Sequence, residues 1–119
     1  MKSENLIKRF LLGCANQKRL ATYTKTIEET KLPFNLGLSN DRKKMSIILE
    51  KISKEEHAKG LPLLSALVVS STDYIPSAGF YSLAVSLGLI SKNATVQEKK
   101  SFAQDQQLKC FRFWKLDEA

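Results

Sequence analysis

Hydrophobic and charged positions divide the chain into a charge-poor centre and two charge-rich flanks. Residues 60–91 are thirty-two positions with a single formal charge, Asp73, whereas lysine, arginine and glutamate are frequent on both sides. A run with so few charges is typical of a segment inside a domain, and amphipathic helices on either side would cover it. The pattern therefore predicts that residues 60–91 form the core of one compact domain.

Apolar residues recur at helical spacing in two segments near the N-terminus. A first helix is predicted to begin with Ser3 as its N-cap. Its buried stripe consists of Leu6, Ile7, Phe10, Leu11 and Cys14. A second, short helix is expected after Thr22 or Thr24 and ends before Pro33, because the residue preceding a proline is pushed out of the α region. Residues 33–40 then form a turn.

A third helix is predicted to begin within residues 39–41, and its first turns are strongly basic. The apolar stripe of this helix consists of Met45, Ile48, Leu49 and Ile52. Its solvent-exposed positions are Arg42, Lys43, Lys44 and Lys51. Ser53 and Glu56 match a capping box, which predicts one separate extra turn that Gly60 closes in the left-handed conformation.

The apolar centre begins with a β-type sequence. Residues 63–71 read LLSALVVSS and predict a strand, and the turn-forming residues 72–79 predict a loop that returns as a second short strand. The two together predict a small β-hairpin. A helix that ends at Gly88 should follow, and Thr95 with Glu98 match a capping box that opens a last, long helix. The expected stripe of the first of these helices is Phe80, Leu83, Ala84 and Leu87.

Composition is that of an ordinary globular domain. A chain of 119 residues with 43% hydrophobic and 26% charged positions can bury a core without disulfides or a metal. Charges interrupt the apolar residues near the N-terminus, and serines with Pro76 interrupt those of the centre, so we expect neither an export signal nor a membrane segment. We expect a cytoplasmic protein in which Cys14 and Cys110 are buried free thiols; a disulfide between them is the alternative.

No sequence motif predicts catalysis. His57 lies near Glu55, Glu56 and Lys59. We interpret this group as solvent-screened ion pairs, with acid–base chemistry as the alternative. The serines lack the glycines of a nucleophile elbow, and no glycine-rich phosphate loop is present. We therefore expect a protein that is not an enzyme and that needs no cofactor and no metal.

The net charge of +7 favours a polyanionic partner, since lysine and arginine neutralise phosphates. The densest local cluster is Arg42, Lys43 and Lys44, where a helix N-terminus adds its own positive field and free amides. Successive residues on a helix point in different directions, so at most two of the three can face one ligand. A solvated basic surface without a partner is the alternative interpretation.

Four segments between Thr22 and Tyr81 resemble the DNA-binding domain of alkyltransferase-like proteins. They read TYTKTIEET, DRKKMSIIL, GLPLLSALVV and GFY, and they span half of the chain. In that family a TYG-type helix start precedes an arginine-led recognition helix, a strand with a proline–cysteine–histidine–arginine motif and a glycine–aromatic return. The resemblance implies a winged-helix-like fold, mainly α with a small β-hairpin, in a single domain of residues 1–119.

The chain departs from this family at the reactive motif. Residues 62–65 read PLLS, without cysteine, histidine or arginine, so the nucleophile and its base are missing and alkyl transfer is excluded. What the resemblance implies is contact with DNA. Thr22 and Tyr23 would lie near the DNA backbone, and Arg42 would head the recognition helix. The loop after Val69 would be the wing.

Two functions follow as alternatives. The first is nucleic-acid binding through the face of Arg42, Lys43 and Lys44, with the loop of residues 70–77 as a wing. The second is an interaction module, such as an inhibitor or immunity partner, that presents a surface to another protein. One contiguous basic face would support the first, whereas dispersed charge with an exposed apolar patch would support the second.

Overall fold

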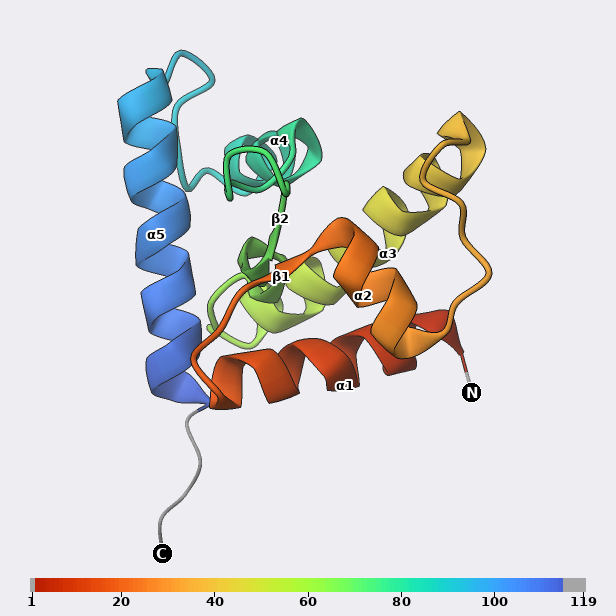
Figure 1. Ribbon diagram of the computed structural model, residues 1–119. Coiled ribbons are helices and arrows are strands. Elements are labelled where there is room, and N and C mark those ends of the chain that lie inside the picture. Colours follow the sequence, from red (N-terminus) through yellow and green to blue (C-terminus); the bar gives the residue numbers. More distant parts are fainter. Residues whose placement is uncertain (1, 115–119) are drawn as a thin grey trace, which may run out of the picture.

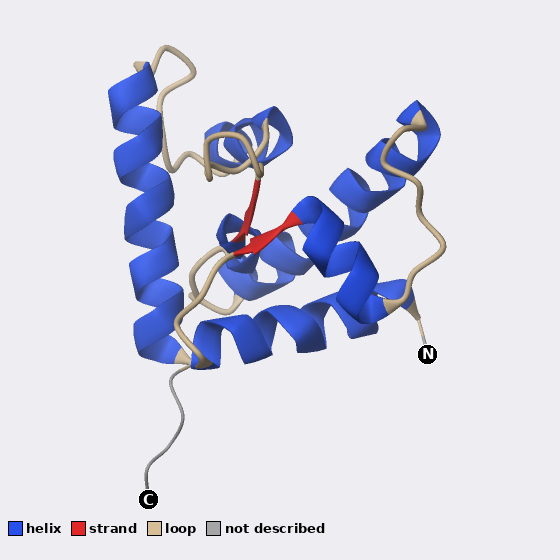
Figure 2. Cartoon of the chain, in the orientation of Figure 1, coloured by secondary structure: helices blue, strands red, loops and turns tan. Residues whose placement is uncertain are grey.

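The computed structural model describes residues 2–114, which form five α-helices, one 3₁₀ helix and two very short strands (Figures 1 and 2). The helices are α1 (Ser3–Asn16), α2 (Tyr23–Thr30), α3 (Ser39–Ala58), α4 (Ala78–Ser86) and α5 (Val96–Phe113). The strands are β1 (Ala21–Thr22) and β2 (Val68–Val69), and the 3₁₀ helix η1 (Leu64–Leu67) directly precedes β2. The predicted mainly helical class is confirmed. No helix of residues 2–114 is long and apolar enough to cross a membrane.

Residues 63–69 are the centre of the molecule. All seven are buried, and η1 contacts α1, α3 and α5, which surround it (Figure 1). The prediction of a buried centre is confirmed for this segment and for the inner face of α4. It is wrong for the loop residues 71–74 and for residues 88–89, which are exposed although they carry almost no charge. These positions include the charged Asp73 and the exposed apolar side chains of Tyr74 and Leu89, so a low density of charge does not by itself indicate burial.

Two hydrophobic clusters form the core, and η1 separates them. Leu64 and Leu67 belong to a cluster with α1 and α3, whereas Leu63 and Ala66 belong to a second cluster with α4 and α5. Side chains three residues apart point in the same direction in a 3₁₀ helix. A strand, with its period of two, would instead place Leu64 and Ala66 on the same side. The two clusters therefore explain why residues 64–67 are not the strand that their composition predicts.

The predicted hairpin is wrong. Ala21–Thr22 pairs with Val68–Val69 in parallel, and the two strands lie far apart in the sequence. Hairpin strands are antiparallel neighbours. The loop after β2 turns back on itself instead, because the Ser70 amide donates a hydrogen bond to the Ile75 carbonyl at 2.9 Å.

The predicted helices α1 and α2 are confirmed, with one correction at the start of α1. Ser3 is the first residue of the helix, and Lys2 occupies the N-cap position without a side-chain hydrogen bond. The predicted Ser3 cap is therefore wrong. The buried residues of α1 are Ile7, Leu11, Cys14 and Ala15.

Helix α3 is longer than predicted. It continues without a break through Ser53 and Glu56, so the separate capped turn is wrong. The Ser53 side chain points into the core, where its Oγ lies 2.6 Å from Ser65 Oγ and accepts a hydrogen bond from the Ser65 amide at 3.0 Å. Gly60 follows the helix in the predicted left-handed conformation, with φ of 78°.

The two helices after the loop are confirmed. Thr95 and Glu98 form the predicted capping box, in which Thr95 Oγ1 accepts the Glu98 amide at 3.1 Å and Glu98 Oε1 accepts the Thr95 amide at 2.9 Å. The hydrogen bond from the Thr95 amide to the Glu98 carboxylate lowers the pKa of that carboxyl. Gly88 ends the α4 segment with φ of 75°. The buried residues of α4 are Phe80, Tyr81, Leu83 and Ala84.

A buried carboxylate joins α3 to α1. Glu56 is 2% exposed, and its Oε1 lies 2.7 Å from Lys8 Nζ and 3.8 Å from Lys59 Nζ. The hydrogen bond to this carboxylate raises the pKa of Lys8, although desolvation opposes the shift. A buried charge that loses its partner is strongly destabilising, so this ion pair fixes the position of α1 along α3.

The Lys8–Glu56 pair predicts a pH dependence of stability. The folded-state pKa of Lys8 lies above its reference value of 10.5, so the pair contributes stability below that pH and loses it as the pH rises through the folded-state value. We expect the free energy of unfolding to fall more steeply above pH 10.5 in the wild type than in Glu56→Gln. Urea denaturation at a series of pH values measures this difference, and parallel curves would contradict the prediction.

Burial of β2 predicts the effect of a charge at its first residue. Val68 is 0% exposed, so Val68→Asp places an unpaired carboxylate in the core, and we expect a loss of about 4 kcal/mol or more in the free energy of unfolding. Val96→Asp is the matched control, because Val96 is 69% exposed at the start of α5. A cooperative, unchanged urea transition for Val68→Asp would disprove the assignment of the core.

Candidate functional site

The three basic residues near the start of α3 are exposed, as the sequence predicts. Within residues 2–114, none of Arg42, Lys43 and Lys44 lies within ion-pair distance of a carboxylate. Several other lysines of the molecule pair with an acidic residue four positions away in the same helix. These are Lys25, Lys54 and Lys109. The beginning of α3 therefore carries three basic side chains without an ion-pair partner within residues 2–114.

The three basic side chains diverge around the helix. Successive residues of an α-helix are rotated by about 100°, so Lys43 is separated by that angle from each neighbour. Lys43 lies on the outer face of α3, where Ile47 follows one turn later. Lys44 shares its side of the helix with Lys51, which pairs with Glu4 of α1 at 3.1 Å. One ligand can thus contact two of the three basic residues at once, but not all three.

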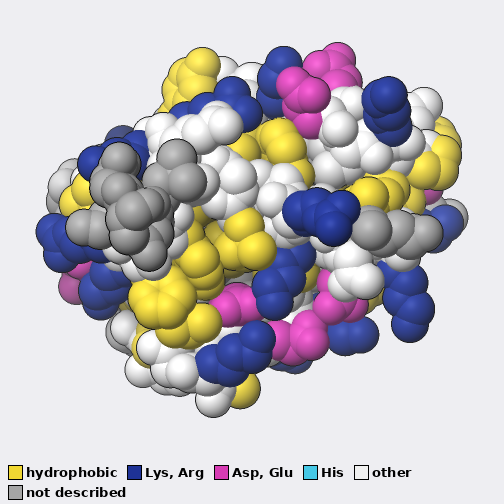
Figure 3. Space-filling model, turned by 90° about the horizontal axis from the view of Figure 1, so that it is seen from below, with side chains coloured by type: hydrophobic (Ala, Val, Ile, Leu, Met, Phe, Trp, Pro, Cys, Tyr) yellow, Lys and Arg dark blue, Asp and Glu magenta, His cyan; other side chains and the backbone are white. Residues whose placement is uncertain are grey.

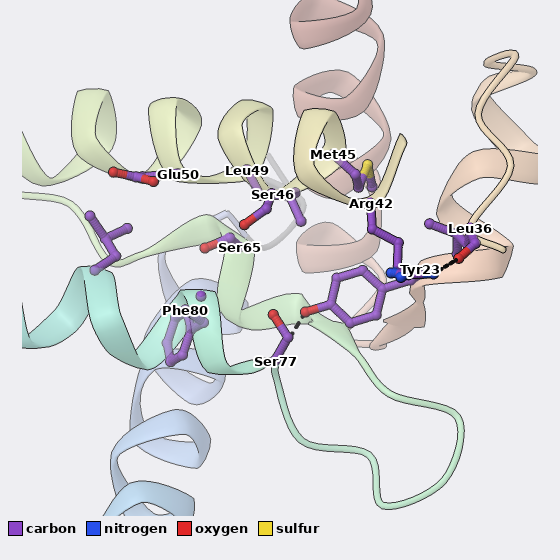
Figure 4. Close-up of a pocket in the computed structure, with 12 residues that line it drawn as sticks. Tyr23, Leu36, Arg42, Met45, Ser46, Leu49, Glu50, Ser65, Ser77 and Phe80 are labelled. Carbon is purple, nitrogen blue, oxygen red and sulfur yellow. Dashed lines mark hydrogen bonds between the residues drawn. The ribbon is translucent and has the colours of Figure 1, made fainter. Parts of the chain in front are cut away.

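Arg42 has a structural contact of its own. Its Nη1 donates a hydrogen bond to the Leu36 carbonyl at 2.7 Å (Figure 4). One residue earlier, the carboxylate of Asp41 accepts the Asn35 amide at 2.8 Å. These two bonds hold the loop between α2 and α3 against the start of α3. The Leu36 bond uses one of the five N–H donors of the guanidinium group, which leaves the others for a ligand.

Thr22 and Tyr23 both have roles within the fold. Thr22 is the N-cap of α2, and its Oγ1 accepts the Lys25 amide at 3.0 Å, as the sequence predicts. Tyr23 is half-buried, and its hydroxyl accepts the Ser77 amide at 2.9 Å. This bond attaches the end of the loop of residues 70–77 to α2. Contact of either residue with a nucleic acid stays a prediction.

A pocket of about 230 Å³ lies between α3, α4 and η1 (Figure 4). Its apolar wall includes Met45, Leu49, Phe80 and Leu83. Its polar residues are Tyr23, Arg42, Ser46, Glu50, Ser65 and Ser77. Gly79 makes the close approach of α4 to α3 feasible at one edge, because a Cβ atom there would lie 2.9 Å from Ser46 Oγ. Arg42 thus belongs both to the basic start of α3 and to the pocket.

Sequence reasoning did not find this pocket, because its residues come from segments that only the fold brings together. One signal was present in α3. Arg42, Ser46 and Glu50 follow one another at intervals of four residues, which places them in a polar row along one side of a helix. This row lies beside the buried stripe of Met45 and Leu49, as the border of an apolar pocket would.

The cysteines and the histidine show no arrangement for catalysis. Cys14 and Cys110 are buried and free. Burial raises the pKa of both thiols, that of Cys110 to about 12, whereas a reactive thiolate needs a lowered pKa. Glu56 pairs with Lys8 inside the protein and so is not available to His57 as an exposed partner. Within residues 2–114 no three His, Cys, Asp or Glu side chains are grouped closely enough to hold a metal ion.

Basic and acidic side chains are mixed on the face of the molecule that Figure 3 shows. On the side that α1 forms, lysine and arginine side chains are interspersed with acidic and exposed hydrophobic ones (Figure 3). Leu38 and Ile47 are 55% and 56% exposed near the basic residues of α3. Of the aromatic residues, Tyr74 is 61% exposed in the loop after β2. Trp114 is partly buried and packs edge-to-face on the exposed Phe113.

Comparison of the chain with protein-family models, with curated proteins and with solved structures found no match. Function is therefore inferred from the geometry of the chain's own residues.

The hydrogen bond between Tyr23 and Ser77 predicts how the loop of residues 70–77 is held. Tyr23→Phe removes the acceptor and keeps the ring, so we expect a loss of about 1 kcal/mol in stability and faster hydrogen exchange of the Ser77 amide. Tyr74→Phe is the control, because Tyr74 is exposed and the loss of its hydroxyl leaves the Tyr23–Ser77 hydrogen bond intact. Equal Ser77 exchange rates in the wild type and Tyr23→Phe would show that this bond does not hold the loop.

Proposed function

We propose that the protein binds nucleic acid through the beginning of α3, in a winged-helix-like arrangement with the loop of residues 70–77. The observation that carries this proposal is that the side chains of Arg42, Lys43 and Lys44 are exposed. None of them lies at ion-pair distance from a carboxylate within residues 2–114. Lysine and arginine contacts to phosphates supply most of the sequence-independent affinity for nucleic acids.

The N-terminus of α3 also supports a phosphate contact. Leu38 is the N-cap and offers no side-chain acceptor, so no capping side chain covers the amides of the first turn. Free amides at a helix N-terminus and the positive end of the helix dipole favour an anion. Asp41 lies in the same turn, but its carboxylate accepts the Asn35 amide and is thereby held toward the preceding loop.

The loop after β2 supports a second contact. Through the Tyr23–Ser77 hydrogen bond, its end is attached beside the pocket into which Arg42 extends (Figure 4). Tyr74 presents an exposed ring in this loop, and an unpaired base can stack on such a ring. Asp73 is the one charge of the loop, and its carboxylate accepts the Ile75 amide at 3.3 Å. The loop would therefore act by stacking more than by charge.

A triple variant tests the basic cluster. Replacing Arg42, Lys43 and Lys44 by alanine should weaken binding of labelled double-stranded and single-stranded oligonucleotides, measured by fluorescence anisotropy. Because the three side chains diverge, we expect the slope of log K against log salt concentration to flatten by about 2. A measurement at about 50 mM and about 150 mM salt suffices to determine the change.

The matched control removes the same three charges elsewhere. Lys92, Lys100 and Arg112 are exposed residues on α5 and the loop before it, on the other side of the molecule from the start of α3 (Figure 1), and none of them pairs with a carboxylate within residues 2–114. Their triple alanine variant has the same net charge as the test variant. An equal loss of affinity in both variants would mean that net charge alone causes binding, and it would overturn the assignment of the site.

A protein partner is the second candidate function. The specific observation for it is that Ile47 is 56% exposed one turn after Lys43 on the outer face of α3, and that charge is mixed on the face shown in Figure 3. An exposed apolar residue beside a basic residue suits a partner whose surface is apolar with an acidic rim. Absence of oligonucleotide binding at both salt concentrations would favour this candidate over nucleic acid.

A further inference from the structure

We propose that the pocket between α3, α4 and η1 binds a small organic acid, with its apolar body in the pocket and its carboxylate on Arg42. This site is additional to the proposed nucleic-acid interface and does not depend on it. The two share Arg42, Tyr23 and the end of the loop at Ser77, whereas Lys43 and Lys44 lie outside the pocket lining.

The size and lining of the pocket define the body of the ligand. The volume of about 230 Å³ exceeds that of an apolar cavity of about 150 Å³, which is large enough to hold benzene. It is smaller than the pockets of about 300–1,000 Å³ that take drug-sized molecules. One ring, or an aliphatic chain of similar bulk, therefore fits. The walls formed by Met45, Leu49, Phe80 and Leu83 would bury it from water.

Arg42 defines the charge of the ligand. Its guanidinium lines the pocket, is anchored by the Leu36 carbonyl at 2.7 Å, and has no carboxylate at ion-pair distance within residues 2–114. An anchored guanidinium with free donors matches the two oxygens of a carboxylate. Glu50 is the acidic residue of the lining, but it lies two helical turns from Arg42 and pairs with Lys54 at 2.9 Å.

A hydroxyl group adds a second donor to the pocket. In Figure 4 the ring of Tyr23 lies between Arg42 and Ser77. The Tyr23 oxygen accepts the Ser77 amide at 2.9 Å, so the hydroxyl proton is left to bond another acceptor. Donors from Arg42 and Tyr23 beside an apolar interior favour a ligand with an anionic or carbonyl end over a cation.

The test uses two probes that differ in charge and hardly in shape, sodium benzoate and benzamide. Each is titrated into ¹⁵N-labelled protein without nucleic acid, and amide chemical shifts are followed by NMR. We expect benzoate to bind with a Kd of the order of 1 mM and benzamide about tenfold more weakly, because the charge-assisted bond to Arg42 is lost. The shifts should be largest at Met45, Ser46, Leu49, Ser77 and Gly79.

Three variants locate the binding. Arg42→Gln should remove the preference for benzoate, whereas Lys43→Gln removes the same charge one residue away, outside the pocket lining, and should leave both affinities unchanged. Ser46→Phe should block both probes. Ser46 is an exposed residue of the lining whose Oγ faces Gly79 of α4, so a larger side chain there fills this edge of the pocket.

The outcomes decide the proposal without reference to nucleic-acid binding. Equal affinities of the wild type for the two probes would overturn it, as would an equal loss of benzoate affinity in Arg42→Gln and Lys43→Gln. Unchanged benzoate binding by a folded Ser46→Phe would also overturn it. If Ser46→Phe does not fold, the comparison of the two glutamine variants is decisive alone.

Discussion

The passage of residues 63–69 through the centre of the protein is the constraint on which the rest of the structure depends. Water does not reach this segment, so its backbone N–H and C=O groups need partners inside the protein. The backbone groups of β2 bond to those of β1, and this pairing places the start of α2 beside β2. The Leu63 amide donates a hydrogen bond to the Gln106 side chain, and the Gln107 side chain donates one to the Ala66 carbonyl. These two bonds place α5 alongside η1.

The same constraint creates the candidate site. The hydroxyl pair of Ser53 and Ser65 holds α3 against η1, and Gly79 lets the first turn of α4 approach α3. The space that stays open between these elements is the pocket. Arg42 lies near the N-terminus of α3, where the pocket meets the basic surface. Arg42 is thus where both proposed ligands would compete, because a bound carboxylate would neutralise the charge that a phosphate needs.

Local signals in the sequence were sufficient for the helices and some of their ends. The caps by Thr22 and by Thr95 with Glu98 involve residues three apart in the chain, and the structure contains both. The same capping-box pattern at Ser53 and Glu56 predicted a helix start that the structure does not contain. Residues three apart also lie on one face of a helix interior, and there both side chains point into the core, where Ser65 and Lys8 bind them.

The amino-acid sequence by itself determined the helical class, some helix boundaries and the exposure of the basic start of α3, because each depends on neighbours within about four residues. Tertiary structure alone decided the parallel pairing of β1 with β2, the 3₁₀ helix η1 that precedes β2, and the pocket around Arg42. These features join segments that are far apart in the chain. Their geometry depends on how side chains fill the space between helices, which no periodicity of a single segment records.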